Sequence, residues 1–166
     1  MRAKTCTRKP ILPVTLTIEM NSKKTILIIE DDEDDREILS VALRGVNDSA
    51  SIAFAENGLL ALDYLTQTKA SEELPCLIVL DLNMPYLDGR QTCRRIKSEL
   101  RLDGIPIIVF TSSHNPNDKV LFESQGVEFI TKPEDFSSLQ AIVKHMLDVC
   151  SLNLNANLQS MLSTMA

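Results

Sequence analysis

Five short runs of apolar, mostly β-branched residues recur along the chain, and a longer segment with helical spacing follows each of them. The runs are residues 25–30, 51–55, 76–81, 106–111 and 127–131. Three of them are continuously apolar, which predicts strands buried on both faces, as in a parallel sheet covered by helices. Because each parallel connection needs a crossover helix, the alternation predicts an open, doubly wound α/β fold of five βα units.

The segments between the runs have apolar residues at helical spacing, and we expect these to face the core. The expected core positions are Ile38, Val41, Ala42 and Val46; Leu59, Leu62 and Leu65; Cys93, Ile96 and Leu100; and Phe136, Leu139, Ile142, Val143, Met146, Leu147 and Cys150. A weaker helical segment at about 115–125 ends before Gly126, a typical helix terminator. Cys76 and Cys93 lie at apolar positions and are expected to be buried, reduced thiols.

The βα units occupy residues 24–150, which we interpret as one domain. Residues 1–23 lack periodicity and are interpreted as an N-terminal extension, with Met20 as an alternative start. Residues 151–166 form a C-terminal tail, in which Leu154, Leu158, Met161 and Met165 continue the apolar stripe of the last helix. Three Asn residues weaken helix formation there. The tail is therefore either frayed, or an extended helix whose stripe meets a partner or a second copy.

The N-terminus is a poor match to a signal peptide, and no apolar run approaches the ~18 residues of a membrane span. We therefore expect a cytoplasmic protein that does not enter the membrane. A sequence pI near 4.9 argues against a general nucleic-acid-binding face. The net charge of −6 comes from six consecutive acids, residues 30–35. Without them, the chain has 17 acidic and 17 basic side chains.

Polar residues stand where four of the five expected strands end. Glu30 and Asp31 follow the first strand, Asp81 ends the third, Thr111 ends the fourth, and Lys132 follows the fifth. In an open α/β sheet the ligand site lies at the carboxyl ends of the strands. The sequence therefore predicts that three carboxylates, a hydroxyl and an ammonium group meet at one edge.

This set of groups suits phosphoryl transfer. Clustered carboxylates without His or Cys suit Mg²⁺, and an Asp can attack phosphorus to give an aspartyl phosphate. A metal and a lysine would neutralise the site, and the hydroxyl of Thr111 could donate to a phosphoryl oxygen. Taken singly, each residue has a simpler interpretation as a cap, a turn or a surface side chain. We expect Asp34 or Asp35 to cap the first helix.

The motifs ILIIEDDEDDREIL, LIVLDLNMPYLDG, IIVFTSS and FITKP occur in order, and the chain between residues 24 and 150 resembles the receiver domain of bacterial two-component response regulators. Within that family it is most similar to the single-domain type, including phytochrome-associated regulators. The resemblance implies a flavodoxin-like, five-stranded parallel sheet of order 2-1-3-4-5.

By the resemblance, Asp81 is the phosphoacceptor, assisted by Lys132 and Thr111. Metal ligands would be Glu30, Asp31, Asp81 and the backbone carbonyl of Asn83, with Asp32 acting through water. Thr111 and Phe129 would form the switch, and Pro133 would follow a cis peptide bond.

The resemblance also implies partners. A histidine kinase or phosphotransfer protein would phosphorylate Asp81 with Mg²⁺, and the changed surface would bind a downstream protein. The face formed by the fourth helix, fifth strand and fifth helix would be the dimer surface. Sixteen residues after Cys150 are too few for a DNA-binding output domain. We expect a signalling domain rather than an enzyme, with at most slow autodephosphorylation.

Three alternative functions fit the sequence less well. A flavodoxin-like electron carrier would need a phosphate-binding loop where this chain has EDDEDD. A hydrolase of the haloacid dehalogenase type would place an acid/base Asp where this chain has Asn83. A phosphorylation-independent docking module would not require the acidic, hydroxyl and lysine residues together.

Overall fold

The computed structural model describes residues 25–47, 50–68 and 74–164. Five strands alternate with five helices: β1 Thr25–Ile29, α1 Glu33–Val46, β2 Ser51–Ala55, α2 Gly58–Gln67, β3 Leu77–Leu80, α3 Gly89–Ser98, β4 Ile107–Thr111, α4 Pro116–Ser124, β5 Glu128–Thr131 and α5 Phe136–Thr164. All strand pairs are parallel, in the order β2-β1-β3-β4-β5. The predicted fold class and strand order are confirmed.

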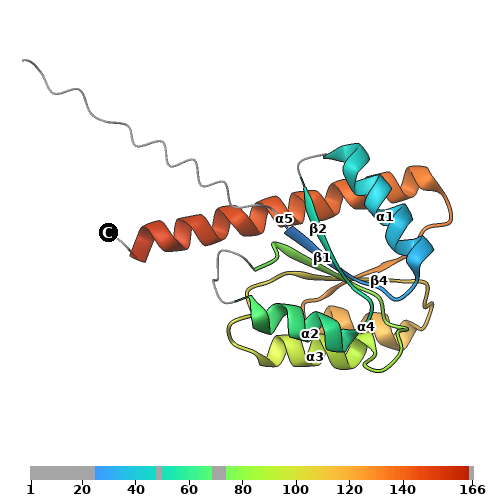
Figure 1. Cartoon of the computed structure of the whole chain (residues 1–166), viewed down its shortest axis with the longest axis horizontal. Coiled ribbons are helices and arrows are strands. Elements are labelled where there is room, and N and C mark those ends of the chain that lie inside the picture. The colour runs from blue at the N-terminus through green and yellow to red at the C-terminus, as the bar shows by residue number, and fades with distance from the viewer. Residues whose placement is uncertain (1–24, 48–49, 69–73, 165–166) are drawn as a thin grey trace, which may run out of the picture.

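The sheet lies between two helical layers, with α1 and α5 on one face and α2, α3 and α4 on the other (Figure 1). Every residue of β3 and β4 is buried, as continuous apolarity predicted. Among the described residues, no helix has the length and hydropathy that a membrane span requires. Gly126 ends α4 with a φ of +69°, a left-handed conformation that glycine adopts without steric cost.

Some predicted core positions are wrong. On α1 the buried residues are Leu39, Ala42 and Leu43, whereas Ile38, Val41 and Val46 are exposed. The apolar residues of α1 are spread around much of its circumference, so their spacing does not identify a single buried face. Leu59 of α2 and Phe136, the first residue of α5, are also exposed, as is Leu100, which lies beyond the end of α3.

The start of α1 also differs from the prediction. Asp32, rather than Asp34 or Asp35, is the N-cap residue, and its Oδ1 accepts a hydrogen bond from the backbone N–H of Asp35 at 3.0 Å. Each Asp in an unbroken acidic run is chemically able to cap, so the sequence alone could not choose among them. The cap frees the side chain of Asp35 for another contact, described below.

Cys76 is not a reduced thiol. It forms a disulfide with Cys150 that joins the residue before β3 to α5, while Cys93 is a buried free thiol as predicted. Just beyond the disulfide, the side-chain amide of Asn153 donates to the backbone carbonyl of Cys76 at 3.1 Å. The two contacts attach α5 to the amino-terminal edge of the sheet.

Beyond Cys150, α5 continues to Thr164, so residues 151–164 are helical rather than frayed. In Figure 1 this part of α5 projects past the sheet. The domain boundary that we predicted at residue 150 falls inside the helix. The N-terminal extension, residues 1–23, lies outside the described residues and stays a prediction.

Candidate functional site

The carboxyl ends of the strands bring the predicted polar residues to one edge of the sheet. Parallel hydrogen bonding continues one residue beyond three strands: Glu30 N–H donates to the Ala55 carbonyl, Asp81 N–H to that of Ile29 and Lys132 N–H to that of Thr111. The backbone of each site residue is therefore fixed by the neighbouring strand. The buried apolar runs before these residues determine the register.

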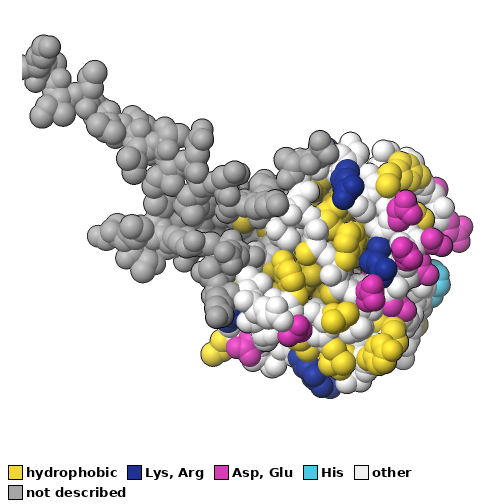
Figure 2. Space-filling view, viewed as in Figure 1, with side chains coloured by type: hydrophobic (Ala, Val, Ile, Leu, Met, Phe, Trp, Pro, Cys, Tyr) yellow, Lys and Arg dark blue, Asp and Glu magenta, His cyan; other side chains and the backbone are white. Residues whose placement is uncertain are grey.

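Three carboxyl groups gather at this edge. Oxygen atoms of Glu30, Asp31 and Asp81 all lie within 4.8 Å of one another, with Glu30 and Asp81 buried and Asp31 exposed. Figure 2 shows acidic side chains grouped around basic ones over the start of α1. Such carboxylates repel unless a proton or cation joins them. This all-oxygen donor set fits a hard divalent cation.

Asp81 has one oxygen partnered and one free. Its Oδ2 accepts from the backbone N–H of Asn83 at 2.8 Å. Its Oδ1 is buried and accepts no hydrogen bond within the described part of the chain, and the nearest cation, Lys132 Nζ, lies 3.9 Å away. A buried, unpartnered carboxylate oxygen costs free energy unless a ligand satisfies it. This oxygen therefore points to binding of a metal or a phosphoryl group.

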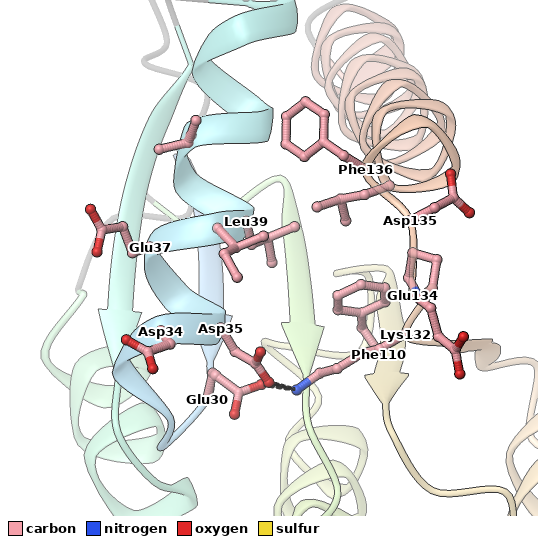
Figure 3. Close-up of a pocket in the computed structure, with 14 residues that line it drawn as sticks. Glu30, Asp34, Asp35, Glu37, Leu39, Phe110, Lys132, Glu134, Asp135 and Phe136 are labelled. Atoms are coloured by element: carbon pink, nitrogen blue, oxygen red, sulfur yellow. Dashed lines mark hydrogen bonds and ion pairs between the residues drawn. The ribbon is translucent and has the colours of Figure 1, made fainter.

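Lys132 contacts two acids (Figure 3). Its Nζ donates to Glu30 Oε2 at 2.7 Å and to Asp35 Oδ2 at 2.6 Å. Burial lowers the pKa of the Lys132 ammonium, but its hydrogen bonds to Asp35 and Glu30 and the charges of Glu30 and Asp81 outweigh burial, so its pKa lies above the ordinary value. Lys132 is therefore a fixed positive charge beside Asp81.

Glu30 has a shifted proton affinity. Burial raises its pKa from 4.5 to about 7, although the hydrogen bond and charge of Lys132 partly oppose this, and the charge of Asp81 adds to the increase. Near neutral pH a proton therefore competes with a metal ion for this carboxyl.

The raised pKa of Glu30 should be visible in the pH dependence of thermal unfolding, measured in EDTA. Because its folded pKa of about 7 lies above 4.5, the folded protein binds the proton more tightly than the unfolded chain. Its stabilising contribution is complete below 4.5 and is lost as pH rises to about 7. Glu30→Gln should therefore unfold at a midpoint that falls less over this range than that of the wild type. Asp34→Asn, a control from the same acidic run, should follow the wild type. An identical pH dependence in Glu30→Gln would contradict the assignment.

Thr111 and Phe129 occupy adjoining strands. Thr111 is fully buried, and its Oγ1 accepts from the backbone N–H of Ser113 at 3.3 Å. Phe129 packs against the core beside Phe122 of α4, with 6.3 Å between ring centroids. The phenyl ring is therefore associated with α4 in this structure. The peptide bond before Pro133 is trans, contrary to the implied cis form.

Two residues near the site were not singled out from the sequence. Arg36 donates from NH1 to the carbonyls of Glu30 and Asp31 at 2.8 and 2.9 Å, and so fixes the backbone that carries these acids. Asp35 was expected only to start the helix but binds Lys132. Both lie in the first turn of α1, directly after the acidic pair. Their closeness in sequence to Glu30 and Asp31 was the signal that could have placed them at the site.

A part-buried ion pair connects α3 and α4, the helices that precede and follow β4. Arg90 of α3 donates from Nε and NH2 to the two carboxylate oxygens of Asp118 in α4, at 2.8 and 2.5 Å. Asp118 is buried, and the hydrogen bonds from Arg90 hold its pKa below the ordinary value. The pair restrains α4 relative to α3.

A cavity of about 650 Å³ opens between α1 and the start of α5, next to Lys132. Figure 3 shows Leu39, Phe110 and Phe136 within it, and Glu30, Asp34 and Asp35 at its acidic end. Ile38 and Val41, exposed on α1, also line it. An apolar, solvent-accessible surface thus adjoins the carboxylate cluster.

An open (βα)₅ sheet with an acidic cluster, a lysine and a buried threonine at its carboxyl edge defines a class of phosphoacceptor signalling domains. Residues 26–144 match the model of the response regulator receiver domain. The chain belongs to that family, and phosphoacceptor signalling is its general function.

Relatives of known sequence and of known structure are also response regulators. Response regulator Rcp1 of Synechocystis sp. is 33% identical over 129 residues, which cover 76% of this chain and 88% of Rcp1. The phosphorylated cyanobacterial phytochrome response regulator RcpA superposes with a TM-score of 0.66 at 33% identity, over 74% of this chain and 89% of that one. The Mn²⁺-bound form of Rcp1 gives 0.65 at 32% identity, over 74% and 90%.

Proposed function

We propose that Asp81 accepts a phosphoryl group from a phosphohistidine of a histidine kinase or phosphotransfer protein. The observation that carries this proposal is the buried, unpartnered Oδ1 of Asp81 between two further carboxyl groups and Lys132. A carboxylate oxygen of Asp81 attacks phosphorus, the N–P bond breaks, and its electron pair returns to the imidazole, which takes up a proton. The product is an aspartyl phosphate.

Mg²⁺ is the proposed cofactor, held by Glu30, Asp31, Asp81 and the backbone carbonyl of Asn83. A relative with bound Mn²⁺ supports a divalent ion at this kind of site. Bound Mg²⁺ would supply positive charge that offsets repulsion between the carboxylates and the phosphoryl oxygens. Lys132 adds a second, permanent positive charge, held 3.9 Å from Asp81 Oδ1. The added phosphoryl group would extend beyond that oxygen and could accept a hydrogen bond from Nζ.

Thr111 and Phe129 are the proposed switch. The Thr111 hydroxyl would turn to donate to a phosphoryl oxygen, and Phe129 would move into the vacated space. Because Phe129 packs against Phe122 of α4, its movement would alter the surface formed by α4, β5 and α5. Phosphorylation then shifts the population between two packings, and a downstream protein binds one of them.

The family membership does not favour the hydrolase and docking-module alternatives. Residue 83 is Asn, and only its backbone N–H contacts Asp81, so this position offers no carboxyl for acid/base catalysis. We propose a cytoplasmic signalling domain without direct nucleic-acid binding and with at most slow autodephosphorylation. The phytochrome association of RcpA suggests a photoreceptor kinase as one source of phosphoryl groups.

Incubation with radiolabelled acetyl phosphate tests the proposed function. The chain should take up one phosphoryl group when Mg²⁺ is present and none in EDTA, because the carboxylates alone repel the anion. The bond between Asp81 and the phosphoryl group should hydrolyse in alkali, as the bond of an acyl phosphate does. Failure of the wild type to take up label in Mg²⁺ would contradict phosphoacceptor activity.

Neutralising Asp31 tests the metal site. Asp31→Asn removes one of the three clustered charges and should weaken Mg²⁺ binding by about tenfold or more, measured by titration calorimetry at pH 8. Glu37→Gln removes an equal charge from the exposed side of α1 and is the control. Wild-type affinity in Asp31→Asn would place the metal elsewhere.

Dimerisation is proposed through the α4–β5–α5 face and the projecting part of α5. Val120 and Leu121 of α4 and Leu152 of α5 are exposed apolar side chains. Deletion of residues 151–166, which leaves Cys150 in place, should weaken self-association, measured as a loss of concentration dependence in sedimentation velocity. If sedimentation and kinase binding both stay unchanged, the projecting helix has no role in association.

A further inference from the structure

The loop between β3 and α3 contains a strained backbone. Tyr86 has a φ of +65° and, among the described residues, is the single non-glycine with a positive φ. The N–H of Leu87 donates to the carbonyl of Pro85 at 2.8 Å, which closes a three-residue turn around Tyr86. The positive φ places this turn in the rare and strained form of the γ-turn. Glycine would adopt this conformation without steric cost.

The surrounding contacts impose this conformation. Met84 and Leu87, on either side of the turn, are buried in the core. The Leu87 carbonyl accepts from the N–H of Gly58 at 3.3 Å, and the N–H of Gly89 donates to the Leu82 carbonyl at 3.1 Å. The loop also packs so tightly that a Cβ on Gly89 would lie 2.1 Å from the Asp81 carbonyl oxygen. The backbone is thus fixed at both ends of the loop.

The Tyr86 side chain contributes little to the stability of the fold, although its backbone is strained. It is 86% exposed, so its ring adds almost nothing to the core. Glycine at this position would make the fold more stable, because it adopts a positive φ without strain. A strained conformation that displays a large aromatic ring on a rigid loop indicates a contact outside the domain. Tyr is a common anchor of protein interfaces because it supplies much area with few rotatable bonds.

The loop is also close to the proposed phosphoacceptor. Tyr86 follows Asp81 by five residues, which limits their separation to roughly 17 Å even for an extended chain, and the turn shortens it. A protein that places phosphohistidine on Asp81 covers about 800 Å² in a standard interface, a disc of roughly 16 Å radius. Tyr86 is therefore within reach of a donor protein of that size that is bound over Asp81.

We propose that Tyr86 is a contact residue for the donor protein and contributes to the choice of donor. This inference rests on the proposed function of Asp81. The occupant is a protein that carries phosphohistidine, because a small phosphoryl donor would not extend from Asp81 to the exposed ring. The ring would pack against the donor's surface during transfer and would not take part in the chemical step.

Three variants of the full chain test the proposal. Tyr86→Gly relieves the positive φ and removes the ring, Tyr86→Ala removes the ring alone, and Tyr86→Phe keeps the ring. The probe is the purified histidine kinase of the source organism that, after autophosphorylation with labelled ATP, transfers fastest to the wild type. Acetyl phosphate with Mg²⁺ is the small-molecule donor, and thermal unfolding is followed by circular dichroism.

Tyr86→Gly should unfold roughly 2–4 °C above the wild type, because the strain is relieved. The same variant and Tyr86→Ala should lose about tenfold or more in kcat/KM for transfer from the kinase, mainly through a higher KM. Tyr86→Phe should keep wild-type transfer within about threefold, and labelling by acetyl phosphate should be unchanged in all three.

Two results would overturn the proposal. Wild-type kinase transfer in Tyr86→Gly would show that the ring makes no donor contact. An equal loss with kinase and acetyl phosphate would assign Tyr86 to the structure of the loop. Failure of acetyl phosphate to label the wild type is a separate result, since it would overturn the proposed function of Asp81 itself.

Discussion

Asp81→Asn is expected to abolish labelling by acetyl phosphate and by a phosphorylated kinase. An amide of nearly the same shape replaces the carboxylate, so the nucleophilic oxygen and its charge are lost together. The fold should survive, because the backbone N–H of Asn83 can still donate to the side-chain oxygen and one of three mutually repelling carboxyl groups is removed. We therefore expect an unfolding temperature equal to or above that of the wild type, and a loss of label of at least about 100-fold.

Asp34→Asn is the matched control. It removes one negative charge from the same acidic run but none from the cluster of Glu30, Asp31 and Asp81, and should keep wild-type labelling. Alkaline hydrolysis and peptide mapping should locate the wild-type label on the peptide that contains Asp81. Label that persists in Asp81→Asn, or that maps to another peptide, would place the acceptor elsewhere.

Reduction of the Cys76–Cys150 disulfide is expected to produce the largest change in stability. The bond closes a loop over a sequence separation of 74 residues, for which chain entropy alone gives about 4 kcal/mol. Measured effects of such bonds are typically 2–4 kcal/mol, so dithiothreitol should lower the unfolding temperature by roughly 10 °C.

The double variant Cys76→Ala, Cys150→Ala provides the control, because it should unfold at a reduced temperature that dithiothreitol does not change. Cys93→Ala keeps the disulfide and should retain the response to dithiothreitol. Mass spectrometry of the unreduced, alkylated protein would show whether the two thiols are linked. A wild type that takes up alkylating reagent at Cys76 and Cys150 under oxidising conditions would contradict the bond.

The centre of the sheet was predictable because β1, β3 and β4 are buried on both faces. Residues such as Ile78 and Val109 have no polar neighbours that suit a helix surface, and polar residues follow each run. The same strand ends then brought Glu30, Asp81, Thr111 and Lys132 to one edge by topology alone. The contacts among these residues needed coordinates, since spacing says nothing about Lys132 binding both Glu30 and Asp35.

The errors have local physical causes. On α1, Ile38 and Val41 are as apolar as Leu39 and Leu43, so periodicity could not identify the buried face. The helix past Cys150 was in doubt because of its Asn residues, yet Asn153 donates to the carbonyl of Cys76 and so helps to hold the helix. Tertiary contact outweighs a propensity of a few tenths of a kcal/mol per residue. The disulfide was missed because nothing in the spacing of Cys76 and Cys150 pairs them.

The place where α5 leaves the domain bears on how this protein can be handled. Strand β1 begins, and α5 passes Cys76, at the amino-terminal edge of the sheet, whereas Asp81 lies at the opposite edge. A five-residue strand separates these edges by roughly 16 Å. An affinity tag, a fluorescent reporter or a surface linker joined at either end of the described chain would thus start on the side away from the carboxylates. Immobilised protein should leave the acidic edge facing solution, which suits binding measurements with intact kinases.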